Sequence, residues 1–146
     1  IKEFGQQFSL SKSVREQHTD TTTIHTSKLP DGVIFAENEI DVKKTVEICQ
    51  KYKCPIIPFG VGSSLEGHVN ALYGGISIDL NNMNKILHVS PEDGYAVVQP
   101  GVTREQLNVY LRDTGLFSQL IQVQMHLLVV WQAQMLLALM QYDMEQ

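Results

Sequence analysis

The chain has 146 residues, an apolar fraction of 43% and a formal net charge of −5. This length and composition fit one globular domain, or part of one, and exclude a disordered or membrane-embedded protein. The negative charge and the lack of a Lys and Arg cluster exclude a nucleic-acid-binding surface. Two cysteines, Cys49 and Cys54, have no further ligands at metal-binding spacing, so we expect ordinary thiols and no metal site.

The predicted elements begin with a polar lead-in, residues 1–29, which is rich in Thr and Ser and has at most one short helix. From Pro30 onward, short apolar runs alternate with helical ones. Strands are predicted at residues 32–36, 55–58, 75–80, 85–89 and 95–99. One helix is predicted from a cap at Asn38 through Lys53, with Val42, Val46 and Cys49 on one face. A second is predicted from a capping box at Thr103 and Gln106 through Arg112, ending before Gly115. Together these elements predict an α+β fold of short mixed strands with packed helices.

A glycine-rich loop follows the strand predicted at residues 55–58, and it reads Gly60-Val61-Gly62-Ser63-Ser64-Leu65-Glu66-Gly67. Glycine lets backbone N–H groups approach a diphosphate closely, and the two serines add hydroxyl donors. A P-loop is excluded because His68 stands where that motif has Lys. The dinucleotide fingerprint is excluded because Leu65 stands where its third glycine belongs. From these residues alone, a phosphate-binding loop and a flexible connection between strands both remain open.

Several motifs together resemble those of D-lactate dehydrogenases, in the same order and at the same spacing. They are Arg15-Glu16-Gln17-His18, Pro55-Ile56-Ile57-Pro58-Phe59-Gly60, Leu65-Glu66-Gly67, Asn84-Lys85-Ile86-Leu87 and Pro100-Gly101-Val102-Thr103. The resemblance covers residues 15–117. Those flavoproteins have an FAD-binding domain of the para-cresol methylhydroxylase/vanillyl-alcohol oxidase type. The resemblance therefore implies that residues 30–117 form the first part of such a domain.

The resemblance also implies a function. FAD would be held non-covalently, with its pyrophosphate on the glycine-rich loop and a second segment, which begins with Pro100, lining the cofactor. The implied contact residues are Pro58, Phe59, Gly60, Val61, Gly62, Ser63, Ser64, Leu65, Glu66, Gly67, Pro100, Gly101, Val102 and Thr103. Thr103 also starts a helix whose positive end is expected to be available to an anion.

The implied reaction is the oxidation of D-lactate to pyruvate in mitochondria, with electrons passed to cytochrome c or a similar acceptor. The catalytic base and any metal ligands are expected in a C-terminal region outside this sequence, so no residue here is assigned a catalytic role. Three alternatives remain open: part of a related D-2-hydroxyglutarate or glycolate dehydrogenase, an inactive truncated product, or a non-enzymatic binding module that uses its apolar tail.

Two residues depart from the family pattern, because Thr19 and His68 stand where the family usually has glycine. Either substitution could disturb a backbone contact. His68 lies later in the loop than the histidine to which some relatives attach their flavin. We therefore expect a surface histidine, or one behind the cofactor contacts, and no covalent flavin bond.

Residues 118–146 form an aberrant tail with no Gly or Pro and with many Gln, Leu and Met residues. The family continues at this point with a glycine-rich stretch. Reading the back-translated codons one base out of frame recovers such a stretch, because Met140-Gln141 must then encode Ala and Met144-Glu145 must encode Gly. We therefore infer a frameshift at about Ser118. The competing interpretation is an amphipathic helix on a membrane surface, although the tail has no Lys or Arg to hold it on anionic lipid.

Overall fold

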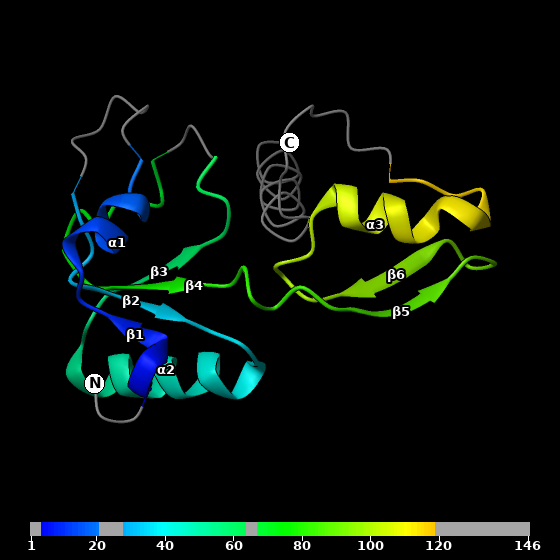
Figure 1. The fold of residues 1–146 in the computed structure, drawn as a ribbon. Coiled ribbons are helices and arrows are strands. Elements are labelled where there is room, and N and C mark those ends of the chain that lie inside the picture. Colours follow the sequence, from blue (N-terminus) through cyan, green and yellow to red (C-terminus); the bar gives the residue numbers. More distant parts are fainter. Residues whose placement is uncertain (1–3, 21–27, 64–66, 119–146) are drawn as a thin grey trace, which may run out of the picture. The chain divides into compact units, whose positions relative to one another are not determined.

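The computed structural model describes residues 4–20, 28–63 and 67–118. The chain divides into two compact units, Ile1–Asn82 and Met83–Gln146 (Figure 1). The first unit contains η1 (Gly5–Gln7), β1 (Phe8–Ser9), α1 (Lys12–Gln17), β2 (Gly32–Phe35), α2 (Glu39–Tyr52), β3 (Ile56–Phe59) and β4 (Ile76–Asp79). The second contains β5 (Ile86–Ser90), β6 (Tyr95–Val98), α3 (Arg104–Leu111) and η2 (Arg112–Thr114).

The first unit is built on a four-stranded sheet in the order β1-β2-β4-β3. Strands β2, β4 and β3 are parallel, and β1 pairs antiparallel with β2 at the edge. Parallel neighbours need a crossover connection, and α2 lies in the connection between β2 and β3. Helices α1 and α2 lie on opposite faces of this sheet (Figure 1). Because β2, β4 and β3 run in the same direction, their carboxyl ends lie together at one end of the sheet.

The helix α2 has the capped start that the sequence predicts. The Asn38 side chain accepts a hydrogen bond of 3.0 Å from the Asp41 N–H, and Lys53 ends the helix in a left-handed conformation with φ of 51°. The predicted buried face is wrong at Val46, which is 43% exposed. Thr45 is buried in its place. Its hydroxyl can be buried because it donates a hydrogen bond of 2.8 Å to the Asp41 carbonyl of the same helix.

The second unit packs α3 on the antiparallel pair β5 and β6. Its core consists of Val102, Leu107 and Leu111, with Ile86, Val89 and Val98 packed against them. Both halves of the predicted capping box form, since the Gln106 N–H donates to Thr103 Oγ1 and the Thr103 N–H donates to Gln106 Oε1. After η2 the chain turns at Gly115 with φ of 74°, as the sequence predicts.

The fold class is confirmed, because the structure is a small mixed sheet with packed helices. Among its described residues, 4–20 and 28–29, the lead-in has one short α-helix, α1, and it also contributes β1, which no pattern predicts. Residues 119–146, the inferred frameshifted tail, lie outside the described residues. Within the described ranges, no helix is both long enough and apolar enough to cross a bilayer.

Candidate functional site

One row of side chains crosses the carboxyl edge of the parallel strands. The register places Phe35 of β2, Asp79 of β4 and Phe59 of β3 side by side. The His18 ring, which follows α1, lies against this row, with its centroid 5.7 Å from that of Phe35 and 4.4 Å from that of Phe59. His18 and Asp79 are both buried. The lead-in thus places an ionisable group on the strand ends that precede the glycine-rich loop.

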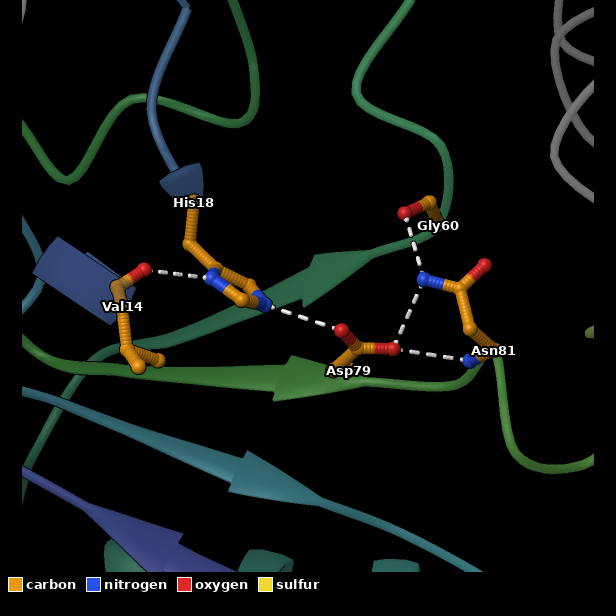
Figure 2. Close-up of polar contacts among 5 residues, drawn as sticks. All are labelled: Val14, His18, Gly60, Asp79 and Asn81. Carbon is orange, nitrogen blue, oxygen red and sulfur yellow. Dashed lines mark hydrogen bonds and ion pairs between the residues drawn. The ribbon is translucent and has the colours of Figure 1, made fainter. Parts of the chain in front are cut away.

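Both ring nitrogens of His18 face hydrogen-bond acceptors. Nδ1 lies 2.7 Å from the Val14 carbonyl oxygen, and Nε2 lies 2.9 Å from Asp79 Oδ2 (Figure 2). Because a carbonyl and a carboxylate can only accept, this geometry favours the doubly protonated, positively charged ring. Burial acts to lower the pKa of His18, but the hydrogen bonds to Asp79 and Val14 and the attraction of the carboxylate raise the pKa above its ordinary value of 6.5.

The second oxygen of Asp79 connects this pair to the glycine-rich loop. Asp79 Oδ1 accepts from both the backbone N–H and the side-chain Nδ2 of Asn81, each at 2.8 Å. Asn81 Nδ2 also donates to the Gly60 carbonyl at 2.9 Å, as Figure 2 shows. A continuous set of hydrogen bonds therefore runs from Val14 through His18, Asp79 and Asn81 to the first residue of the loop.

The loop leaves the sheet with unused backbone donors. The last ladder bond joins the Leu80 N–H to the Phe59 carbonyl at 3.1 Å. Beyond it, the N–H groups of residues 61–63 donate to no acceptor in the part of the chain that the structure describes. Gly62 has φ of 67°, a conformation that favours glycine. Three successive backbone donors are thus available to a ligand. Ser64, Leu65 and Glu66, also predicted to bind the cofactor, lie outside the described residues.

The far end of the loop is held by the lead-in as well. Gly67, with φ of 74°, accepts from the Asn70 N–H at 3.0 Å. Asn70 Oδ1 in turn accepts from Thr19 Oγ1 at 2.6 Å and from the Asp20 N–H at 2.9 Å. Thr19, one of the two departures from the family pattern, therefore forms a contact of its own. His68, the other departure, is exposed.

The predicted segment at residues 100–103 offers a different surface. Every N–H in it already has an acceptor: Gly101 donates to Met83, Val102 to Gln99 and Thr103 to Gln106 Oε1, whereas proline has none to offer. The Val102 side chain is completely buried in the core of the second unit. Gly101 is buried as well, so this segment offers a cofactor no backbone N–H groups and no exposed glycine Cα.

Sequence reasoning missed the polar residues that support the loop. His18 stands in one of the matched motifs, but nothing nearby in the sequence indicates a partner, and Asp79 lies 61 residues away. Asp79 and Asn81 did carry a signal, because polar residues directly after a buried parallel strand lie at its carboxyl end, where such sheets bind ligands.

Among the described residues, neither the cysteines nor the other potential metal ligands form a metal cluster. Cys49 and Cys54 are free thiols, and burial, together with the neighbouring Cys54, raises the pKa of Cys49. No group of three or more His, Cys, Asp or Glu side chains is gathered for a metal ion within residues 4–20, 28–63 and 67–118.

The fold and this geometry define a class of protein: a mixed α and β domain that presents unpaired backbone donors at the carboxyl edge of its parallel strands. The family of the FAD binding domain matches residues 30–124. The chain belongs to this family, and its fold is that of part of a para-cresol methylhydroxylase-type domain.

Similar proteins support this assignment. The chain is 45% identical over 109 residues to a probable mitochondrial D-lactate dehydrogenase of Danio rerio, covering 75% of this chain and 22% of that protein. It is 40% identical over 92 residues to the mitochondrial D-lactate dehydrogenase [cytochrome] of Arabidopsis thaliana, covering 63% of this chain and 16% of that protein. The crystal structure of p-cresol methylhydroxylase with substrate bound matches with a TM-score of 0.68 at 25% identity, covering 77% of this chain and 22% of that one. The chain thus spans about a fifth of the length of these relatives.

Proposed function

We propose that the loop at residues 60–67 binds the diphosphate of FAD, in a flavoenzyme that oxidises D-lactate. The observation that carries this proposal is the set of three successive N–H groups, at residues 61–63, which have no acceptor among the described residues. Backbone N–H groups of a glycine turn are well suited to an anion, because they surround it with partial positive charge. The donor set therefore fits one phosphate of a dinucleotide.

The protein's part in this function is to bind and orient the cofactor. FAD would supply the two-electron redox chemistry when bound. Residues 58–63 and 67 would hold its diphosphate side, with Ser63 adding a hydroxyl donor. The segment at residues 100–103 would line the cofactor as well, as the resemblance to D-lactate dehydrogenases implies. The catalytic base is proposed to lie beyond this sequence, so no described residue is assigned the proton-transfer step.

D-lactate is the proposed substrate because two relatives of the chain carry that activity in their names. Pyruvate would be the product, and cytochrome c or a similar protein the electron acceptor. Both relatives are named as mitochondrial proteins, and we propose the same compartment for this one.

The test uses a frame-restored protein, in which the reading frame is corrected at Ser118 and the chain continues to the length of its relatives. We expect it to purify with flavin absorbance, to release the flavin on acid precipitation, and to reduce cytochrome c or a dye with D-lactate. Glycolate and D-2-hydroxyglutarate are the comparison substrates, and faster turnover with either would reassign the substrate. Flavin that stays with the precipitate would contradict non-covalent binding. A colourless protein that takes up no added FAD would overturn the proposed function.

A further inference from the structure

We propose that His18 is a positioning residue that fixes the peptide bond between Gly60 and Val61, so that the Val61 N–H faces the FAD diphosphate. This inference rests on the proposed function of the loop. His18 lies in the lead-in, before the residues that match the family, 30–124. It reaches the loop along two routes, one polar and one aromatic.

The polar route sets the direction of the peptide. In a trans peptide unit the C=O and N–H bonds point to opposite sides. Asn81 Nδ2 holds the Gly60 carbonyl at 2.9 Å, so the Val61 N–H is directed away from Asn81. Asp79 orients Asn81 through two hydrogen bonds, and His18 orients Asp79. If this peptide rotated, it would turn a carbonyl oxygen toward the anion and replace an attractive contact with a repulsive one.

The aromatic route supports the next residue of the loop. The His18 ring lies on the Phe59 ring, at 4.4 Å between centroids. The Phe59 ring fills the space beside Gly62, where an added Cβ would lie 2.8 Å from Phe59 Cζ. Because Gly62 follows Val61 directly, His18 supports two successive peptide units of the loop. Loss of the imidazole would free both Asp79 and the Phe59 ring to move.

The charge of His18 acts within the protein rather than on the ligand. Its positive charge faces Asp79 from β4. Its nearest charged neighbours along the chain are Glu16, which pairs with Lys12 at 3.6 Å, and the buried Asp20. Arg15 follows next and donates to the Pro30 carbonyl at 3.3 Å. An imidazolium paired with a carboxylate presents little net charge to a diphosphate. We therefore expect the His18 contribution to FAD affinity to be insensitive to salt, in contrast to a direct contact between exposed charges.

The experiment measures FAD affinity of the frame-restored apoprotein by flavin fluorescence. His18→Gln and Asn81→Ala should each raise the dissociation constant at least about tenfold, since each disrupts hydrogen bonds that orient the loop. The double variant should bind no more weakly than the weaker single variant, because both residues act on the same peptide. For each variant, the ratio of its FAD dissociation constant to that of the wild type should be unchanged by added salt. His88→Gln, an exposed histidine of β5, is the matched control and should bind as wild type does.

A second readout follows the peptide itself, in the apoprotein and without turnover. Labelling with ¹³C-carbonyl glycine and ¹⁵N valine reports peptide bonds between Gly and Val, of which this chain has three. His18→Gln and Asn81→Ala should shift the signal of the pair Gly60 and Val61. Both should leave that of Gly101 and Val102 unchanged, as an internal control for folding.

The inference would be overturned if the two substitutions had fully additive effects on FAD affinity. It would also be overturned if a folded His18→Gln variant bound FAD within about twofold of the wild type. An unmoved signal for Gly60 and Val61 would also overturn it. If His18→Gln fails to fold, Asn81→Ala alone tests the inference, through its FAD dissociation constant and its Gly60 and Val61 signal. A wild-type protein that binds no FAD would refute the proposed function instead, and the shift of the Gly60 and Val61 signal would then show whether His18 orients the peptide.

Discussion

The ring of Phe59 occupies the space that a side chain on Gly62 would need, and Gly62 itself has φ of 67°. Gly62→Val in the frame-restored protein would therefore displace the ring and strain the backbone. We expect it to purify with clearly less bound flavin, measured as the ratio of flavin to protein absorbance. The stability cost of the positive φ alone is about 1–2 kcal/mol.

Gly94→Val is the matched control for that prediction. Gly94 has φ of 70°, and an added Cβ would meet nothing within 4 Å. It should cost similar stability while the protein keeps its flavin. Equal flavin loss in the two variants would show that backbone strain, rather than the loop contact, causes the effect.

Gly75→Ala should destabilise the first unit strongly. Gly75 has φ of 111°, and an added Cβ would collide with the backbone carbonyl of Pro55. That carbonyl accepts the Ile76 N–H at 2.9 Å, where the pairing of β3 with β4 begins. We expect a loss of about 3 kcal/mol or more in urea unfolding. Gly115→Ala, with φ of 74° and open space, should lose only the strain term, and equal losses would contradict the collision.

The His18 pair predicts how stability depends on pH. The pKa of His18 is raised in the folded protein, so the folded state binds the proton more tightly than the unfolded chain does. Its stabilising contribution is fully present below a pH of about 6.5 and is lost as pH rises through the raised value. His18→Gln should therefore lose most stability in mild acid, and its deficit should shrink toward alkaline pH.

Urea unfolding between about pH 5.5 and 8.5, where histidine changes charge, would measure that deficit, with His88→Gln as the control. A deficit that stays constant across this range would mean that His18 contributes through packing and not through its charge.

The inferred frameshift predicts the behaviour of the chain as written. Its tail has no glycine, whereas the resemblance implies a glycine-rich stretch after residue 117 that would let the chain come close to a flavin. We expect it to bind no FAD tightly and to show no D-lactate-dependent dye reduction, whereas the frame-restored protein does both. Genomic DNA around the Ser118 codon, compared with transcripts, tests the cause directly. A yellow and active short chain would make the tail a functional segment.

Local features of this fold could be predicted from the sequence because their causes lie within a few residues. Asn38 and Thr103 cap helices that start at the next residue, and Gly115 ends the last turn. The strand β1 could not be predicted, since two residues carry no period and their pairing with β2 is long-range.

The candidate site divides in the same way. The glycine spacing predicted the loop, and its free N–H groups agree with a ligand-binding role, which stays a prediction. The loop's support could not be read, because His18 meets Asp79 only through the tertiary fold. Phe59 and Val102 were both predicted to bind the cofactor, and because their side chains are buried, at 8% and 0% exposed, any such contact would be made by their backbone. An apolar residue beside a glycine motif gives no sign of whether it faces the ligand or the core.

The contact between His18 and Asp79 also bears on the order of folding. It joins residues 61 positions apart, and Thr19 meets Asn70 across 51 positions. Closing such long loops costs conformational entropy before any contact repays it, so these bonds form slowly compared with helices and local turns. The glycine-rich loop would therefore acquire its final shape only after β4 has joined the sheet and the lead-in has docked on it. On the ribosome, a chain still awaiting β4 would have its donors in place but unsupported, and tight cofactor loading would be a late event in the life of the nascent protein.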